Sequence, residues 1–384
     1  MDYSNRPIPH VDEEVLKSPE QRRWNNYLLE NSPEYRELSE LRRQGWKNRE
    51  GDDYFVGRRR QADNPTAEGK TLFFEMMRQI GSEMDGMSRI FTFASPPRVL
   101  DLCFAPGGFV SAILERNPGA VVRGTTLPPA QGGHDILLPG WETDPRVRVT
   151  LCDLTMLAGE MGIEPAMVPE EHPDRANFDF SKGLLVEGGS PDGGAGGGPR
   201  SWAGRARGWR EDAFDLVICD GNVLRTQQRA AYREGREAER LTLTQLVLGV
   251  RRLRRDGAGR LVILLHKADA PATAALLRTL SGFARVRLFK PRRKHGIRSS
   301  FYALATGVRA GSDEAARAVA AWHRRWVLAT LGSDAEWEAS RAADPDVDAL
   351  IADFGPELLR LAKPVWRIQA EALKKASFIP GKTW

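Results

Sequence analysis

The residues Asp101-Leu102-Cys103-Phe104-Ala105-Pro106-Gly107-Gly108-Phe109 run from a short apolar stretch into a pair of glycines. The apolar stretch predicts a buried strand, and the residues after the glycines predict a helix. Glycines at such a turn let the backbone approach a ligand, and the helix presents free N–H groups and its positive end to an anion. The stretch therefore predicts a ligand-binding turn in an α/β fold, although many α/β proteins have a similar turn for structural reasons.

From Pro96 onward, short apolar runs alternate with helical patterns, which is typical of βαβ units. This alternation predicts an α/β fold with a seven-stranded, mostly parallel sheet and flanking helices. The expected helices are residues 108–116, 227–255 and 270–281. The expected strands are residues 98–103, 120–127, 147–152, 214–220, 260–267, 284–290 and 300–308.

The segments before and after this sheet predict helical extensions. In residues 1–95, apolar side chains recur at helical spacing over 19–50 and 70–81. Residues 311–384 are also helical in pattern, and Asp344-Pro345-Asp346 and Gly355-Pro356 should break them into at least three helices. Within the central domain, residues 96–310, the glycine-rich stretch 186–210 has almost no apolar residue and is expected to be a flexible insertion.

The composition is that of an ordinary water-soluble protein. No apolar run approaches the roughly 20 residues that span a bilayer, and the N-terminus resembles neither a signal peptide nor a transit peptide, so we expect a cytoplasmic or nuclear protein. The net charge of +5 is compatible with a polyanionic partner, although 56 basic against 51 acidic residues is a modest excess. Cys103, Cys152 and Cys219 follow no zinc spacing and are interpreted as core thiols, so no metal is expected.

The core Ala105-Pro106-Gly107-Gly108-Phe109 resembles the first motif of the FtsJ-like ribose 2′-O-methyltransferases, which reads close to DLxxAPGGW/F. The resemblance continues through RGTTLPPAQGGH, the acidic residue after the third strand, FDLVICD and KPRRKHGIRSSFYALATG, and it covers about residues 96–308. It implies a Rossmann-like methyltransferase fold that uses S-adenosylmethionine and acts on RNA. Ribosomal RNA, transfer RNA and the messenger RNA cap are not distinguished.

The resemblance also implies which residues hold the cofactor. Backbone around Gly107 and Gly108 would hold its methionine part, and Asp153 would accept a hydrogen bond from the adenine amine. A helix N-cap is the alternative interpretation of Asp153. The expected cofactor residues are Asp101, Ala105, Pro106, Gly107, Gly108, Phe109, Thr125, Thr126, Leu127, Asp153 and Asp220.

Methyl transfer to a ribose hydroxyl needs alignment and a base. The family uses a Lys-Asp-Lys-Glu set, in which Lys267 would be the base and Asp220 would orient it, both at the carboxyl ends of expected strands. A solvated lysine and a turn or cap aspartate are the alternatives. Ser300 stands where the glutamate is expected, two residues before Tyr302, and Lys70 is a substitute for the first lysine. The tetrad is therefore incomplete, which leaves weak, altered or lost activity open.

A basic loop precedes the last expected strand, beside the catalytic edge. Such a loop is suited to a phosphate backbone, and a solvated surface loop is the alternative. Two other functions stay open: a non-catalytic scaffold or regulatory subunit that binds cofactor or RNA, and a methyltransferase for a small molecule or protein. The helical extensions could contact a protein partner. The expected substrate residues are Arg292, Arg293, Lys294, Arg298, Ser299 and Ser300.

Overall fold

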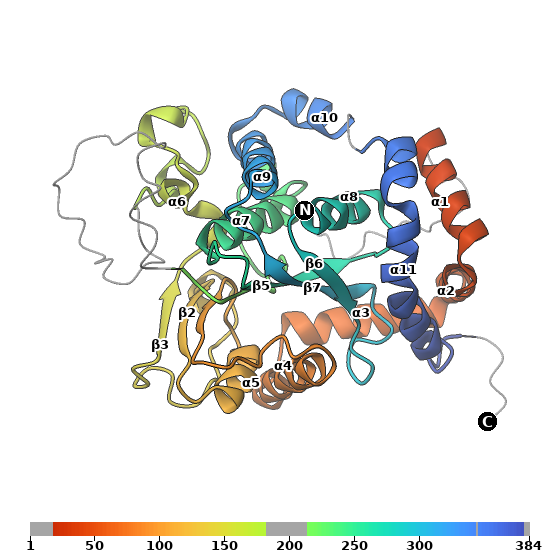
Figure 1. Cartoon of the computed structure of the whole chain (residues 1–384), viewed down its shortest axis with the longest axis horizontal. Helices are drawn as coiled ribbons and strands as arrows, with labels where there is room; N and C mark the ends of the chain where they lie inside the picture. Colours follow the sequence, from red (N-terminus) through yellow and green to blue (C-terminus); the bar gives the residue numbers. More distant parts are fainter. Residues whose placement is uncertain (1–17, 182–212, 343–344, 380–384) are drawn as a thin grey trace.

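The apolar runs of the sequence form one central sheet in the computed structural model, which describes residues 18–181, 213–342 and 345–379 (Figure 1). The strand order is β3-β2-β1-β4-β5-β7-β6, and β7 runs in the opposite direction to the other strands of this sheet. This confirms the predicted fold class, and each strand ends within two residues of its expected bounds. The strands are β1 (Arg98–Asp101), β2 (Val121–Thr126), β3 (Val147–Leu151), β4 (Leu216–Cys219), β5 (Gly259–His266), β6 (Arg285–Phe289) and β7 (Ser300–Val308).

The strand order reverses next to β1. The chain places β2 and β3 on one side of β1, and then β4 and β5 on the other. In open α/β sheets, ligands bind at such a reversal, outside the carboxyl ends of the strands. The topology therefore predicts a ligand site among the loops that follow β1, β2, β3 and β4.

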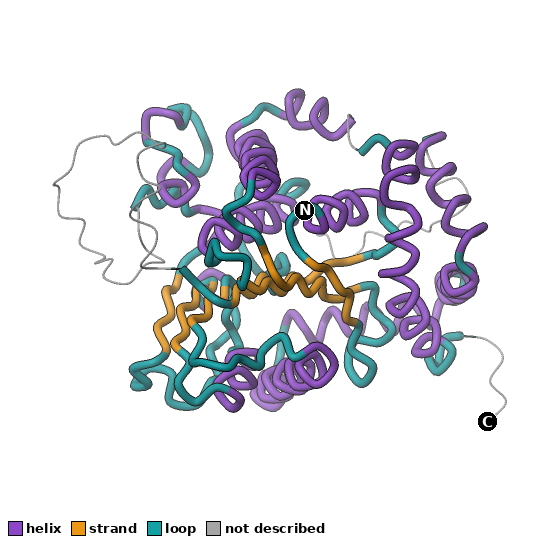
Figure 2. The backbone as a smooth tube through the Cα atoms, viewed as in Figure 1, coloured by secondary structure: helices purple, strands orange, loops and turns teal. Residues whose placement is uncertain are grey.

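Helices cover both faces of the sheet, and Figure 2 shows the strands as a single layer between them. The predicted helix 108–116 is confirmed as α5, and 270–281 as α8, while the helix at 70–81 is part of a longer α4. The helices are α1 (Pro19–Asn31), α2 (Pro33–Trp46), α3 (Arg49–Asp63), α4 (Ala67–Ser88), α5 (Gly108–Arg116), α6 (Ala158–Met161), α7 (Glu237–Arg252), α8 (Pro271–Ser281), α9 (Asp313–Leu331), α10 (Asp334–Ala342) and α11 (Val347–Leu373).

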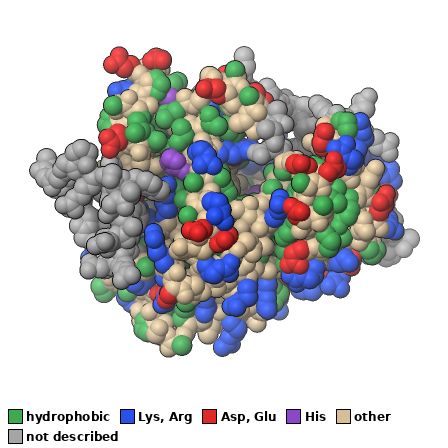
Figure 3. All heavy atoms as spheres, turned by 45° about the horizontal axis from the view of Figure 1, so that its top comes forward, with side chains coloured by type: hydrophobic (Ala, Val, Ile, Leu, Met, Phe, Trp, Pro, Cys, Tyr) green, Lys and Arg blue, Asp and Glu red, His purple; other side chains and the backbone are tan. Residues whose placement is uncertain are grey.

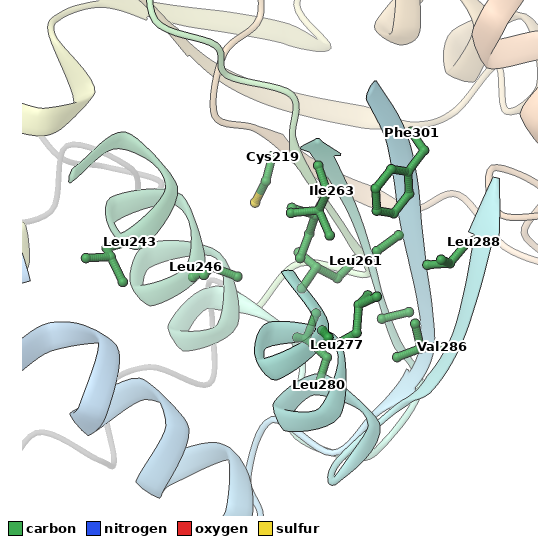
Figure 4. Close-up of a cluster of buried hydrophobic side chains, with 14 of the residues drawn as sticks. Cys219, Leu243, Leu246, Leu261, Ile263, Leu277, Leu280, Val286, Leu288 and Phe301 are labelled. Atoms are coloured by element: carbon green, nitrogen blue, oxygen red, sulfur yellow. The ribbon is translucent and has the colours of Figure 1, made fainter. Parts of the chain in front are cut away.

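Two apolar clusters hold these layers together. On β4, Leu216 and Ile218 belong to the cluster with α4 and α5, whereas Val217 and Cys219 belong to the cluster with α7 and α8. Figure 4 shows part of the second cluster, in which Leu246 of α7 and Leu277 and Leu280 of α8 lie on the side of their helices nearer the strands. Because both faces of the strands are buried, the strands read as nearly continuous apolar runs.

Two helix predictions are wrong. The helix expected from residue 227 begins at Glu237, because the residues before it form a loop whose side chains bond to other parts of the chain. The break expected at Gly355-Pro356 is absent from α11, which also contains Pro364. Gly355 lies against α1, where an added Cβ would be 2.5 Å from the Tyr27 hydroxyl, so tertiary packing keeps α11 continuous despite the proline.

The first two helices of the described chain pack beside the last one, with α1 and α2 against α11 (Figure 1). Tyr35 and Trp366 place their ring centroids 5.1 Å apart across this contact. The glycine-rich insertion predicted at 186–210 lies outside the described residues. Where the chain is described, no helix is long and apolar enough to cross a membrane.

Candidate active site

A pocket opens where β1, β2, β3 and β4 end. Five predicted cofactor residues line it: Ala105, Thr126, Leu127, Asp153 and Asp220. The wall also includes Phe73, Met77, Leu102, Cys103, His134, Cys152, Leu154, Thr155, Gly221, Asn222, Leu224, Gln227, Glu237 and Leu241. Sequence patterns did not indicate most of this second group, because α4 and the loops after β2 and β4 contribute many of its members. Of the three cysteines, Cys219 is a core thiol as predicted, while Cys103 and Cys152 are half-buried in the pocket wall.

The glycine turn lies behind the pocket wall. Gly107 is the N-cap of α5 with a φ of 97°, a left-handed conformation that favours glycine. A Cβ on Gly107 would meet Leu138 at 3.0 Å, and a Cβ on Gly108 would lie 2.5 Å from the Cβ of Met77. Both glycines are thus enclosed by protein, where they permit the turn and the close approach of α5 to α4.

The other predicted cofactor residues also lie outside the wall. The Thr125 hydroxyl donates to the Leu102 carbonyl at 2.8 Å, which ties β2 to β1. The Pro106 carbonyl accepts from Leu137, and Phe109 packs edge-to-face on Tyr302. Thr125, Pro106 and Phe109 therefore contact the residues behind the pocket wall and support its shape.

Two carboxyl groups lie side by side at the ends of β1 and β4. Burial raises the pKa of Asp101 to about 7, although the Cys103 backbone N–H donates to it. Burial, and then the neighbouring Asp101, raise the pKa of Asp220 well above its usual range, while a hydrogen bond from Tyr302 opposes this. Asp220 Oδ1 is buried, and none of the residues that the structure describes donates a hydrogen bond to it. An acceptor without a donor in a pocket wall favours a ligand that brings an N–H group or a positive charge.

Asp153 is held by four donors. Its Oδ1 accepts from the Thr155 backbone at 3.0 Å and from the Thr155 hydroxyl at 2.8 Å, so the N-cap interpretation holds. Its Oδ2 accepts from Gln227 Nε2 at 2.9 Å and from Arg233 Nη2 at 2.8 Å. Burial would raise the pKa of Glu237, but its bonds to Arg233 and the charge of Arg240 hold that pKa below its usual value.

Lys267 and Asp220 are not brought together. Cys219 pairs with Ile263, so Asp220 is level with Leu264, three residues before Lys267. At about 3.3 Å per residue, their backbones are offset by roughly 10 Å along the strand. Lys267 is exposed, does not line the pocket, and has a left-handed φ of 50°. Its backbone N–H donates to the Ser299 carbonyl at 3.0 Å.

The remaining tetrad positions are also apart from the pocket. Lys70 Nζ pairs with Asp135 at 2.6 Å on a half-exposed surface. Phe73, one turn further along α4, lines the pocket and places its ring centroid 5.3 Å from that of His134. Ser300 is buried on β7 opposite His266. Neither Lys70 nor Ser300, the two residues that the resemblance offers for these positions, lines the pocket.

The basic loop between β6 and β7 is held in place from inside. Lys290 is buried, and its Nζ donates to the carbonyls of His295 at 2.8 Å and Ser300 at 2.7 Å. Burial, followed by the charges of Arg42 and Arg298, lowers the pKa of Lys290 to about 7. Lys290 is therefore a structural residue that fixes the loop.

The rest of this loop is at the surface. Arg293 and Lys294 are exposed, and Arg292 makes a 3.5 Å contact with Glu371 of α11. Figure 3 shows that basic and acidic side chains both occur across one face of the molecule, in keeping with the nearly balanced charge. The overall charge therefore does not indicate a nucleic-acid surface, and such a surface would require a local cluster of basic side chains.

One such cluster joins α3 to the loops at the carboxyl edge of the sheet. Arg225, in the loop after β4, pairs with Asp63 at the end of α3 at 2.8 Å. Partial burial lowers the pKa of Arg298, and the charges of Arg58 and Arg225 lower it further, so each of these two guanidinium groups acts electrostatically on Arg298. The sequence patterns indicated Arg298 but not Arg58 or Arg225, because the fold alone places α3 over this edge.

The sheet order and the pocket at its reversal define a Rossmann-like methyltransferase fold. A profile of the FtsJ-like methyltransferases matches residues 82–307, more than half of the chain. The chain belongs to the FtsJ-like methyltransferase family and is an S-adenosylmethionine-dependent methyltransferase. No curated protein matches it by sequence.

Several solved structures are similar at low identity. A chain assigned as a ribosomal RNA methyltransferase from Plasmodium falciparum is 14% identical over 59% of this chain and 93% of its own, with a TM-score of 0.34. Human methyltransferase-like protein 13 in complex with SAH is 11% identical over 69% of this chain and 99% of its own, with a TM-score of 0.35. A fibrillarin/Nop5p complex gives 12% identity over 56% and 74%, with a TM-score of 0.31. Because these identities and TM-scores are low, the assignment to the family rests on the match to the family profile and on the pocket.

Proposed function

We propose that this protein transfers the methyl group of S-adenosylmethionine to ribose 2′-hydroxyls of RNA. The observation that supports an RNA substrate is the group of Arg58, Arg225 and Arg298 at the carboxyl edge of the sheet. The charges of Arg58 and Arg298 repel each other in the free protein, while Asp63 neutralises Arg225, and a phosphate backbone would relieve the repulsion at Arg298. The FtsJ-like family match supports the reaction, and the cluster supports a polyanionic substrate.

The pocket residues fit the cofactor. S-adenosylmethionine supplies a methyl group on a positively charged sulfur, together with an ammonium group and a flat adenine. Asp220, with its buried acceptor, would face the cationic part. Leu127, Leu154 and Leu224 would cover the faces of the adenine.

RNA would lie across the edge formed by α3 and the loop between β6 and β7. Arg58 and Arg298, with exposed Arg293 and Lys294, would contact phosphates, while Ser300 begins β7 and Ser299 immediately precedes it. Because these cations come from segments far apart in the sequence, their grouping depends on the folded state.

Lys267 remains the proposed base. It stands at the carboxyl end of β5, and its left-handed backbone is a conformation that ordinary residues adopt at a cost and that is enriched at functional sites. In the free protein its side chain is exposed, so RNA binding would have to bring the hydroxyl to it. The register gives no support to Asp220 orienting Lys267, and Asp220 is better placed to serve the cofactor.

A second function is favoured by a specific observation. Phe73 lines the pocket on α4 while Lys70 is engaged by Asp135, and Ser300 replaces the glutamate. A chain with these changes could bind cofactor and RNA without transferring a methyl group. Such a protein would act as a scaffold or regulatory subunit.

The test is methyl transfer from radiolabelled S-adenosylmethionine to total RNA and to cap analogues. A 2′-O-methyl group blocks alkaline cleavage of the adjacent phosphodiester, so the label should appear in alkali-resistant dinucleotides. Label in mononucleotides would indicate base methylation, and label in protein or a small molecule would indicate another substrate. Cofactor and RNA binding without any transfer would favour the non-catalytic function.

A further inference from the structure

The carboxylate of Asp153 already has four donor groups of described residues within hydrogen-bond distance. A carboxylate offers about four acceptor positions, and Thr155 occupies two of them through its backbone N–H and its hydroxyl. Gln227 and Arg233 occupy the other two at 2.9 and 2.8 Å. An adenine amine would have to displace one of these donors to reach Asp153.

Gln227 is in a position to receive that amine instead. Its Nε2 must face Asp153, because an ionised carboxylate accepts hydrogen bonds and donates none. Its Oε1 therefore points away from Asp153, and none of the residues that the structure describes donates to it. Gln227 lines the pocket together with Leu127, Leu154 and Leu224, which offer an apolar surface for a flat ring.

The orientation of the Gln227 amide is fixed by a buried ionic network. Arg233 bonds to Asp153 and to Glu237, whose carboxylate is nearly enclosed by protein. Burial would lower the pKa of Arg233, but the hydrogen bonds that Arg233 donates to Glu237 and Asp153, and the charges of these carboxylates, outweigh burial and raise it. With Arg233 charged beside it, Asp153 remains an acceptor, so the glutamine amide cannot turn over.

We propose that Gln227 Oε1 accepts the hydrogen bond of the adenine 6-amine of the cofactor, and that Asp153 and Arg233 are positioning residues that hold the amide in that orientation. The proposal rests on the cofactor assignment and does not depend on RNA being the substrate. It predicts selection against a purine with an oxygen at the 6-position, since that oxygen would face Oε1 as a second acceptor.

The test is calorimetric titration with three ligands that differ at the 6-position of the purine. These are S-adenosylhomocysteine, S-inosylhomocysteine and the homocysteine derivative of purine riboside, which carries hydrogen there. Wild-type protein should prefer the adenine ligand over the inosine ligand by on the order of tenfold, with the third ligand between them. Equal affinities for all three, or no binding of any, would overturn the proposal.

Gln227→Met keeps the length of the side chain and removes the acceptor. The adenine preference should fall to within about twofold in this variant, while binding of the purine riboside ligand is retained. If the preference survives in Gln227→Met, Asp153 or another group contacts the amine and the proposal is wrong. Gln227→Leu, which also lacks the acceptor, decides the same question if the methionine variant does not fold.

Asp153→Asn tests the positioning role separately. Asparagine offers a donor as well as an acceptor, so the Gln227 amide can turn over and present its NH₂ to the ligand. The adenine-to-inosine preference should shrink, while affinity for the purine riboside ligand, which does not depend on amide orientation, stays within about twofold. A residue with only a structural role would weaken all three ligands alike, and that result would exclude positioning by Asp153.

Discussion

Tyr302 of β7 donates a hydrogen bond to Asp220, which follows β4, and this contact reaches across β5. Leu264 of β5 lies between them in the register, paired with Tyr302. Tyr302 is the residue that follows Ser300 by two places in the family ending. Asp220 therefore keeps a partner from β7 even though the glutamate is missing.

Tyr302→Phe should destabilise the fold by about 1 to 3 kcal/mol, because it leaves Asp220 buried without a donor. The change should also raise the pKa of Asp220 further, since the hydrogen bond that it removes opposes the effect of burial. Urea unfolding measures the loss of stability. Tyr54→Phe, at a more exposed site, is the matched control and should change stability by about 0.5 kcal/mol or less. Equal effects of the two substitutions would contradict the assigned hydrogen bond.

Asp101→Asn should reduce the dependence of stability on pH. The folded pKa of Asp101, about 7, lies above its ordinary value of 3.8, so the native state binds more protons between these values. The stabilising contribution is complete below the unfolded pKa and is lost as pH rises through 7. A folded pKa that lies one pH unit above the unfolded pKa corresponds to about 1.4 kcal/mol of such stabilisation.

Urea unfolding at pH 5 and pH 8 checks the effect of Asp101→Asn. Relative to wild type, the variant should be more stable at pH 8 than at pH 5, because asparagine can still accept from Cys103 and carries no buried charge. A residual slope should remain from Asp220, whose pKa is also raised by burial. A difference between variant and wild type that is the same at both pH values would rule out titration of Asp101.

Gly108→Ala should strongly destabilise the protein. The added Cβ would lie 2.5 Å from the Cβ of Met77 and 2.6 Å from the Phe74 carbonyl oxygen, so α4 and α5 would have to separate. Gly86→Ala in α4, where nothing lies within 4 Å of the added Cβ, is the control. It should stabilise the helix by about 0.5 to 1 kcal/mol. Thermal unfolding compares them, and a tolerated Gly108→Ala would disprove the close approach of the two helices.

Lys267→Ala should abolish methyl transfer and leave binding of S-adenosylhomocysteine nearly unchanged. The reason is that a base acts in the transition state, and Lys267 does not line the cofactor pocket. Single-turnover transfer and calorimetric titration measure the two effects separately. If wild type and variant transfer methyl groups equally well, another group is the base.

Arg58→Ala combined with Arg298→Ala should weaken RNA binding and flatten its salt dependence. The slope of log affinity against log salt should fall by about 0.7 for each phosphate of a single strand that the variant no longer neutralises. Arg317→Ala is the matched control, because its side chain is 70% exposed on α9 and pairs with Glu314. Fluorescence anisotropy at several salt concentrations distinguishes them, and an unchanged slope in the double variant would assign the cluster to the solvated surface.

Much of the fold could be predicted from the sequence because it depends on local patterns. The bounds of the seven strands follow from the sequence to within two residues, since strands buried on both faces are apolar throughout. The segment 101–109 also indicated the family, because a turn of this shape requires glycine at Gly107 whatever surrounds it. Both features depend on residues that are consecutive in the sequence.

The assembled site depended on contacts between residues far apart in the sequence. Gln227 leaves its expected helix because Asp153 bonds its amide, and Gly355 stays helical because Tyr27 packs against it. The strand register decides that Lys267 lies three residues beyond the level of Asp220. Likewise, only the path of α3 brings Arg58 to Arg298. Pairing across strands and helices has no local pattern, so only the tertiary structure could decide which side chains meet.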